Sequence, residues 1–422
     1  MIIKVNYGDT LFSLSQKYGV PVSKIIADNG IYDESPVVGQ SLILQKADED
    51  FIPIENTLVS SISNSFGIGE KELFRNNYIL GGKNDVPEGT YIVISYIDTP
   101  STEKIIGGYA YDFISAKKLS SVINYLTYIM PFTYGFTEDS ELIKPKDEFI
   151  LNMAKESGVK ALMHVSTLTK DGNFDSNLPS LIFSDSDKTS LLIDNIINEV
   201  NGKEYSGVDI DFEFLPAKEK SNYVNFVRLL SDRLHQDGKI LVIAVPPKTS
   251  DSQRGLLVEG IDYRGLGEIA DYILIMAYEY GYRFGPPLAI APINQITKVL
   301  DYALTKVPSE KILLGLSNYG YNWTLPFVMG KSDAPSISTV EAIELAKKYG
   351  SEILFDETSM APYFFYTDNE GNEHEVWFED ARSFKAKMDL IKNYNLAGGF
   401  IWDLMRDNPQ GFVTINSLVK II

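Results

Sequence analysis

The chain has 422 residues, of which 44% are hydrophobic, and its formal net charge at pH 7 is -19. This length exceeds one ordinary domain and suits a barrel of roughly 250 residues with small added modules. The strong negative charge argues against nucleic acid or an anionic membrane surface as a partner.

Cysteine is absent and histidine is rare. Without cysteine the chain can form neither disulfides nor thiolate metal sites. The three histidines, His164, His235 and His374, are scattered along the sequence. We therefore expect structural or surface roles for them and no metal site.

The N-terminus shows no apolar segment of the kind that directs export, since residues 1–4 lead straight into a Gly-Asp-Thr turn. No apolar run approaches the roughly 20 residues needed to span a bilayer. We expect a monomer, made in the cytosol and without a membrane span. Such a protein would reach an external glycan by lysis or by assembly around a structure inside the cell.

Residues 1–47 predict a small module of strand, helix, helix and strand. Residues 2–7 alternate like a strand, and the apolar residues of 11–18 have helical spacing. Asp9 or Thr10 can cap this first helix. A second helix and a closing strand are predicted over residues 22–27 and 41–44.

This segment resembles a LysM module, a small fold that binds N-acetylglucosamine-containing glycans. The resemblance implies that glycan lies between the loop after the first strand and the loop after the second helix. The residues at these loops are Gly8, Asp9, Thr10, Asn29 and Gly30. Turn and cap chemistry alone could also explain these residues, and that alternative stays open.

The same pattern returns over residues 50–97, with a period of about 47 residues. Thr57 stands where Thr10 stood, and Asn76 follows it at the spacing that separates Thr10 from Asn29. The loop residues differ between the copies. We therefore predict a second, degenerate LysM module, followed by a short linker.

From residue 102 to residue 422, apolar strands alternate with helical segments, which is typical of parallel βα units. Eight such strands close into a barrel, so we predict an α/β fold, a (β/α)8 TIM barrel. The predicted strands are Ile105–Ala110, Tyr125–Phe132, Ala161–Ser166, Val208–Phe214, Ile240–Val245, Tyr272–Tyr278, Ile312–Leu316 and Gly398–Trp402.

The stretch between the last two strands is too long for a single helix. It contains a helical pattern over 339–349 and two strand-like runs, 363–367 and 374–378. A turn at 368–371 would join these runs as a hairpin. We predict a small α+β insertion over residues 320–385 of the barrel.

Residues 207–213 carry three acids, Asp209, Asp211 and Glu213, alternating with apolar residues. Strand period places the acids on one face. Like charges so close raise at least one pKa, which favours a site of proton transfer. A half-exposed edge strand could show the same alternation, although edges are usually protected by Lys. A barrel strand that delivers a catalytic acid to its C-terminal end fits better.

The acidic stretch resembles the Asp-x-Asp-x-Glu signature of the family-18 glycoside hydrolases, which are chitinase-like barrels. Ser206 departs from the Asp-Gly that usually precedes the signature. The resemblance implies that the substrate's own 2-acetamido oxygen attacks the anomeric carbon. It implies Glu213 as general acid and then base, and Asp211 as the group that orients the acetamido. Asp209 would share a proton or hydrogen bond with Asp211, and no cofactor is implied.

Two further motifs extend this resemblance. Met276, Tyr278 and Glu279 resemble the Met-x-Tyr-Asp motif of the sixth barrel strand, with Glu in place of Asp. Tyr278 would donate its hydroxyl to the acetamido oxygen, and Trp402 would form the floor beneath the reacting sugar. Either aromatic residue could instead be a core residue. Tyr319, like Tyr109, Tyr111 and Asn318, follows a strand end and could line the cleft.

Paired LysM modules on a family-18 barrel resemble the cortex-lytic and cortical-fragment-lytic N-acetylglucosaminidases of spore-forming bacteria. The resemblance implies hydrolysis of peptidoglycan after N-acetylglucosamine, with retention, by a protein made in the mother cell and built into the spore. A chitinase would have the same chemistry. A chitinase-like lectin is a further alternative, but lectins of that kind usually lack the final Glu of the signature, and Glu213 is present.

Overall fold

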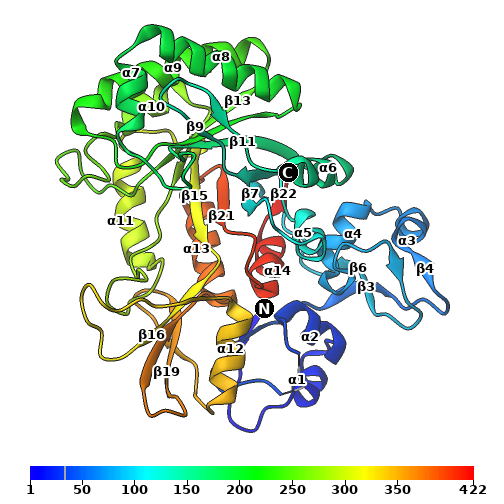
Figure 1. Cartoon of the computed structure of the whole chain (residues 1–422). Helices are drawn as coiled ribbons and strands as arrows, with labels where there is room; N and C mark the ends of the chain where they lie inside the picture. The colour runs from blue at the N-terminus through cyan, green and yellow to red at the C-terminus, as the bar shows by residue number, and fades with distance from the viewer. Residues whose placement is uncertain (33–34) are drawn as a thin grey trace.

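A computed structural model describes residues 1–32 and 35–422. It contains two small N-terminal modules, a closed barrel and an insertion in the barrel (Figure 1). The C-terminal helix α14 (Pro409–Leu418) packs against helices of both modules and so joins them to the barrel. No helix among the described residues is long and apolar enough to cross a membrane.

The first module has the predicted order of strand, helix, helix and strand. The Thr10 side chain caps the first helix, and Gly19 ends it in the left-handed conformation. The two strands pair antiparallel. The elements are β1 (Ile2–Lys4), α1 (Leu11–Tyr18), α2 (Val22–Asn29) and β2 (Ser41–Ile43).

The second module repeats this arrangement, with β3 paired antiparallel to β6. Its first strand begins at Ala47, so the boundary between the modules lies slightly before the predicted one. The elements are β3 (Ala47–Phe51), β4 (Thr57–Leu58), α3 (Val59–Phe66), α4 (Glu70–Asn76), η1 (Tyr78–Leu80), β5 (Asp85–Val86) and β6 (Ile92–Tyr96).

A buried asparagine relates the two modules. Asn29 donates to the carbonyls of Ile25 and Ile43 and accepts from the Ile43 N–H. Asn77 makes the equivalent three bonds in the second module. The structural counterpart of Asn29 is therefore Asn77, one residue after the Asn76 that sequence spacing indicated.

The barrel contains the eight predicted strands, all parallel. The last strand pairs with the first, which closes the sheet, and the short β22 (Lys420–Ile421) adds to the first strand outside the ring. The ring consists of β7 (Glu103–Tyr111), β8 (Tyr128–Phe132), β11 (Lys160–Ser166), β12 (Gly207–Asp211), β13 (Ile240–Val245), β14 (Tyr272–Ile275), β15 (Ile312–Ser317) and β21 (Gly398–Trp402).

Helices follow most of these strands and cover the outside of the ring (Figure 1). The barrel helices are α5 (Ala116–Ile123), α6 (Glu148–Glu156), α7 (Leu178–Phe183), α8 (Ser186–Gly202), α9 (Lys220–Gln236), α10 (Tyr263–Ile269), α11 (Ile293–Ala303) and α13 (Ala381–Asn393). Short elements fill the connections: β9 (Gly135–Phe136), β10 (Leu142–Ile143), η2 (Ala217–Glu219) and η3 (Ser309–Lys311).

Three strands are shorter than predicted. Tyr125 and Leu126 belong to the turn that ends α5, because their N–H groups bond to carbonyls three residues earlier. β12 and β14 end early because the chain leaves the sheet at the rim, where Phe214 and Glu279 have positive φ values of 55° and 64°. Residues in these rim turns are the ones that face the cleft.

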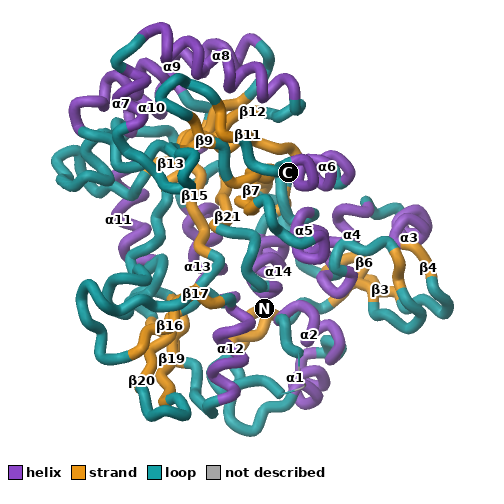
Figure 2. The backbone as a smooth tube through the Cα atoms, viewed as in Figure 1, coloured by secondary structure: helices purple, strands orange, loops and turns teal. Residues whose placement is uncertain are grey.

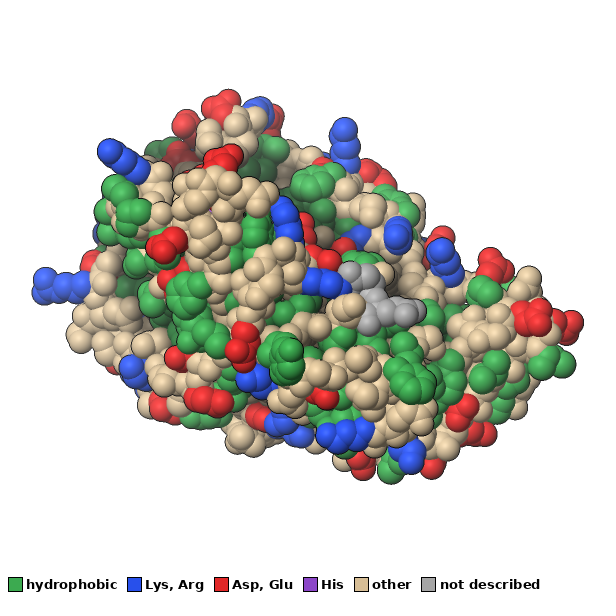
Figure 3. All heavy atoms as spheres, turned by 90° about the horizontal axis from the view of Figure 1, so that it is seen from below, with side chains coloured by type: hydrophobic (Ala, Val, Ile, Leu, Met, Phe, Trp, Pro, Cys, Tyr) green, Lys and Arg blue, Asp and Glu red, His purple; other side chains and the backbone are tan. Residues whose placement is uncertain are grey.

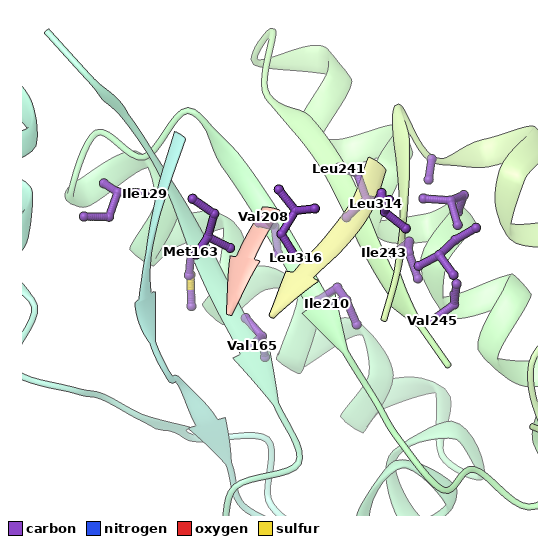
Figure 4. Close-up of a cluster of buried hydrophobic side chains, with 14 of the residues drawn as sticks. Ile129, Met163, Val165, Val208, Ile210, Leu241, Ile243, Val245, Leu314 and Leu316 are labelled. Atoms are coloured by element: carbon purple, nitrogen blue, oxygen red, sulfur yellow. The ribbon is translucent and has the colours of Figure 1, made fainter. Parts of the chain in front are cut away.

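The barrel core has two layers separated by strand alternation. Outward-pointing side chains such as Val208, Ile210, Ile243 and Leu316 pack between strands and helices (Figure 4). A second set, including Met130 and Leu313, fills the barrel interior. Because successive strand residues face opposite sides, Asp209, which lies between Val208 and Ile210, must point inward.

The insertion between β15 and β21 contains the predicted helix and hairpin, but its sheet has five strands where two were predicted, and it lies beside the first module (Figure 2). It ends before Ala381, since α13 packs on the barrel core, so the predicted boundary at 385 runs into that helix. Its elements are β16 (Gly320–Thr324), β17 (Ser336–Ile337), α12 (Thr339–Lys348), β18 (Leu354–Asp356), β19 (Ala361–Thr367) and β20 (Glu373–Trp377).

The surface formed by this end of the molecule has no dominant charge. In the view of Figure 3, acidic and basic side chains are interspersed among hydrophobic ones. The excess of acidic residues is therefore not gathered into one patch on this face.

A buried ion pair fixes α13 where the insertion returns to the barrel. Lys387 Nζ lies 2.6 Å from Glu379 Oε2, and both side chains are almost fully buried. The Ser317 hydroxyl of β15 donates to the other carboxylate oxygen at 2.9 Å. Removing the cation would leave a buried charge without its partner.

We expect Lys387→Met to lower the free energy of unfolding by about 3–5 kcal/mol, measured by urea denaturation. Lys385→Met is the matched control on the same helix, because Lys385 pairs with Asp389 in an exposed position. That variant should lose less than about 1 kcal/mol. Equal losses in the two variants would contradict the importance of the buried pair.

Candidate active site

The acidic strand β12 points its carboxyls into the barrel. Asp209 is completely buried, and Asp211 has a side chain 18% exposed. Glu213 follows after the strand has ended and lies half-buried at the rim. The apolar residues between them belong to the outer core layer, so the predicted division of the two faces is confirmed.

Side chains from two other barrel strands contact the deepest carboxyl group, Asp209. The Tyr109 hydroxyl of β7 donates to Asp209 Oδ2 at 2.7 Å, and His164 Nδ1 of β11 lies 2.8 Å from the same oxygen. His164 is 1% exposed. These contacts compensate for the burial of Asp209, which would otherwise be costly.

His164 is a site residue that the sequence analysis did not identify. It pairs in register with Asp209, so the two side chains point to the same side of the sheet. Its inward position in the predicted strand 161–166 was a usable signal, since alternation there places Leu162, His164 and Ser166 on one face. We had assigned all three histidines structural or surface roles.

Asp211 lies between Asp209 and the pocket. His164 Nε2 is 4.0 Å from Asp211 Oδ2. Burial raises the pKa of Asp211 well above its usual range, and the charge of Glu213 raises it further. The Oδ1 atoms of Asp209 and Asp211 are both buried without a donor among the described residues. That Asp209 and Asp211 share a proton therefore remains a prediction.

A pocket of about 380 Å³ opens above these residues. Six of the predicted site residues line it: Asp211, Glu213, Met276, Tyr278, Glu279 and Trp402. Residues that the sequence analysis did not place there complete the wall: Phe132, His164, Ser166, Thr167, Phe174, Ser176 and Phe214. Tyr109, which we had considered a possible cleft residue, also lines the pocket.

Tyr278 reaches the pocket through a gap left by a glycine. A Cβ atom on Gly315 of β15 would lie 2.6 Å from Tyr278 Cε1, so a larger residue there would displace the ring. Burial raises the pKa of Tyr278 well above its usual range, and the carboxylates of Asp211 and Glu213 add to this effect. The phenol therefore keeps its proton and can act as a hydrogen-bond donor.

Glu279 accepts hydrogen bonds from the hydroxyls of Tyr319 and Tyr321, the latter at 2.9 Å. Burial raises its pKa, while the two hydroxyls act in the opposite direction. Tyr319 lies in an adjoining pocket rather than in the first one. Tyr319 contacts the first pocket through Glu279. The sequence analysis had indicated that it could line the cleft directly.

Trp402 and its neighbours form an aromatic wall. Its ring centroid lies 4.9 Å from that of Phe132 and 5.5 Å from that of Tyr109, both in edge-to-face geometry. Phe132 stacks in turn on His164 at 4.9 Å. This wall is suited to the apolar face of a sugar and shields the carboxyls from water.

Glu213 has the properties of a proton donor. Burial raises the pKa of its carboxyl, and the negative charge of Glu279 raises it further. A carboxylic acid that keeps its proton near neutral pH can protonate a leaving oxygen. No group of three or more His, Cys, Asp or Glu side chains in residues 1–32 and 35–422 could hold a metal ion.

The predicted glycan-binding residues of the first module differ in how accessible they are. Gly8 has a φ of 87° with open space around it, and Asp9 Oδ2 accepts from the Asn6 N–H at 2.8 Å. Thr10 serves as the helix cap. Asn29 is 1% exposed, with its amide engaged by the main chain. A Cβ on Gly30 would lie 2.9 Å from Val340, so this loop abuts α12.

Comparisons with known proteins agree with this geometry. The family model "Glycosyl hydrolases family 18" matches residues 74–407, and the LysM domain model matches residues 3–45. The "Cortical fragment-lytic enzyme" of Bacillus anthracis is 32% identical over 421 residues, which cover 97% of this chain and 96% of that protein.

One solved structure is similar over the whole chain and another over three quarters of it. The crystal structure of the Bacillus megaterium QM B1551 spore cortex-lytic enzyme SleL matches with a TM-score of 0.84 and 31% identity, covering 100% of this chain and 98% of that one. The chitinase from Chromobacterium violaceum matches with a TM-score of 0.69 and 25% identity, covering 75% and 99%.

We expect Glu279→Gln to move the alkaline limb of the pH profile of kcat/KM to lower pH. The amide keeps its contacts with the tyrosines but removes the charge that raises the pKa of Glu213. Glu213 then loses its proton at a lower pH, and activity falls with it. Hydrolysis of a fluorogenic N-acetylglucosamine glycoside across pH measures the shift. Glu156→Gln, on the outer helix α6, is the control, and an unmoved limb in Glu279→Gln would contradict the coupling.

Proposed function

The chain belongs to glycosyl hydrolases family 18, and we propose that it is an N-acetylglucosaminidase of spore-cortex peptidoglycan or its fragments. It would hydrolyse the β-1,4 bond after N-acetylglucosamine with retention of configuration. One observation carries the proposal: Asp211, Glu213, Tyr278 and Trp402 converge on one pocket above the buried Asp209.

In the proposed reaction, the reacting sugar packs on Trp402 and its 2-acetamido oxygen attacks the anomeric carbon. Glu213 protonates the departing glycosidic oxygen, for which its raised pKa suits it. Water then attacks the oxazolinium intermediate, and Glu213 accepts the proton of that water. The acid and base steps therefore use the same carboxyl at different stages.

Asp211 and Tyr278 would hold the acetamido group in its attacking position. The carboxyl of Asp211 accepts the N–H and stabilises the positive charge of the oxazolinium ion. The phenol of Tyr278 donates to the acetamido oxygen. Tyr109 and His164 act one step further away, since they hold Asp209 beneath Asp211 and so position the carboxyl that touches substrate.

The choice of peptidoglycan follows the relatives rather than the reaction chemistry. Proteins named as cortical fragment-lytic or spore cortex-lytic enzymes match nearly the whole of this chain, including the N-terminal modules. The similarity to the chitinase covers 75% of the chain. A chitinase remains the second candidate, because the reacting pocket alone would serve either glycan.

The first module would add glycan affinity through the loop that contains Gly8, Asp9 and Thr10. Asn29 is better explained by its buried bonds to the main chain, which favours a structural role for that residue. The spore is the proposed location, on the basis of the same relatives.

We expect Glu213→Gln to reduce kcat by about 10²–10⁴-fold while glycan binding is kept, because only the proton donor is lost. Turnover of cortex fragments and the affinity for an N-acetylglucosamine oligomer are measured on the same preparation. Glu219→Gln lies on the same loop but outside the pocket and serves as the control. Retained turnover in Glu213→Gln would refute the assigned role.

We expect cleavage to require the N-acetyl group of the sugar at Trp402. A fragment whose glucosamine has been de-N-acetylated lacks the internal nucleophile, so its hydrolysis should fall to background. Proton NMR of the first products from the acetylated fragment should show the β-anomer at a glucosamine reducing end. Equal cleavage of both fragments, or an α-anomer as first product, would contradict substrate assistance.

A further inference from the structure

A second pocket adjoins the first at Trp402. It has a volume of about 470 Å³ and shares Trp402 and Glu279 with the first. Residues of the loop after β21, of the β7 loop and of the insertion line it. Glu213 lines only the first pocket, so the second lies away from the proton donor and has room for a neighbouring sugar.

Arg406 gives this second pocket a chemistry that the first lacks. Among the described residues that line the two pockets, Arg406 is the one with a cationic side chain. The titratable acids around it are Asp211, Glu213, Glu279 and Asp403. A neutral glycan would offer this guanidinium only uncharged acceptors, whereas an anion would form stronger, charge-assisted hydrogen bonds with it.

The guanidinium of Arg406 is available for a ligand. It forms no ion pair with any residue that the structure describes, and among those residues its side chain makes one hydrogen bond, from Nη2 to the Ser336 hydroxyl at 2.6 Å. A guanidinium has five N–H donors in a planar fork. Most of its donors are therefore left for an anion in the pocket.

The loop that carries Arg406 is held in place. The main-chain carbonyl of Arg406 accepts hydrogen bonds from Lys118 Nζ at 2.6 Å and from Asn318 Nδ2 at 3.2 Å. Asp403 Oδ1 accepts from the Met405 N–H at 2.9 Å. These contacts, from helix α5 and from the residue after β15, fix the main chain that carries the guanidinium, and its bond to Ser336 restrains the side chain, which lowers the entropic cost of binding.

An alternative role for Arg406 is to balance the charge of Asp403 and nothing more. That carboxyl lies in the same pocket, yet no ion pair joins it to Arg406 in the described part of the chain. A guanidinium placed for Asp403 alone would be expected to meet it in the bidentate geometry that Arg283 adopts with Asp333. The open fork instead favours a ligand from outside.

We propose that Arg406 forms a carboxylate-binding subsite for the peptide-bearing sugar next to the reacting N-acetylglucosamine. The inference rests on the proposed function. Because the two sugars of peptidoglycan alternate, both neighbours of an N-acetylglucosamine are muramic acid sugars, whose lactyl group either carries a stem peptide or, in cortex, is closed to a lactam. A stem peptide attached there ends in a free carboxylate, whereas chitin carries no anion. Arg406 would therefore distinguish the two glycans.

The test compares three substrates with wild type, Arg406→Gln and Arg406→Lys. The substrates are soluble cortex fragments with free peptide carboxylates, the same fragments with the carboxylates converted to methylamides, and a chitin oligomer. We expect Arg406→Gln to lose about 10- to 100-fold in kcat/KM on the free carboxylates, as for a charge-assisted hydrogen bond. The other two substrates should be unaffected. Arg406→Lys should recover part of the loss, because it keeps the charge without the fork.

Arg233→Gln is the matched control, since Arg233 lies on the outer helix α9 and pairs with Asp194. Equal losses on all three substrates, or no loss on the free carboxylates, would overturn the subsite. Should wild type cleave only the chitin oligomer, the proposed function fails. In that case the subsite is tested by binding alone. Calorimetry measures the affinity of the Glu213→Gln variant and of the Glu213→Gln/Arg406→Gln double variant for the free-carboxylate fragment. Equal affinity of both variants for the free-carboxylate fragment would refute it.

Discussion

The site depends on keeping the carboxyl group of Asp209 inside a closely packed barrel. Asp209 is completely buried, and an isolated carboxylate there would cost several kcal/mol. Tyr109 and His164 reduce that cost with two short contacts to one oxygen. His164 reaches Asp209 because adjacent parallel strands in register point paired residues to the same side, and Tyr109 reaches it from β7 through the barrel interior. Closure of the barrel therefore brings the acidic residues of β12 and the side chains that contact Asp209 together.

The same burial sets the chemistry of the groups nearer the mouth. Trp402, Phe132 and Tyr109 exclude water from one side of the pocket. In this poorly solvated space, carboxyl groups and phenols favour their neutral forms, so Asp211, Glu213 and Tyr278 all have raised pKa values. A neutral acid and a neutral phenol are the forms that donate protons and hydrogen bonds. The aromatic wall therefore favours the protonated forms of the acids and the phenol in the pocket.

The sequence was sufficient to predict the barrel, its eight strands and the first module, because those rest on local periodicity and caps. The acidic row was predicted for the same reason, since alternation alone assigns its direction. His164 was missed because a single histidine has no periodic pattern of its own, and its role appears only when two strands are set in register. The correspondence of Asn29 with Asn77 was off by one residue, since spacing does not reveal which amide bonds to the main chain.

Because the reacting residues would serve any N-acetylated glycan, selectivity has to come from surfaces around them. The first module is one such surface, and it is held rigidly. A Cβ on Gly39 would lie 1.9 Å from the Ile353 carbonyl, and the Ile353 N–H bonds to the Val38 carbonyl at 2.9 Å. A module packed this closely on the insertion cannot search for glycan as a tethered domain does. If it binds glycan as proposed, it would add affinity only to glycan chains whose path reaches both surfaces at once, and this fixed geometry would favour long glycans over short ones.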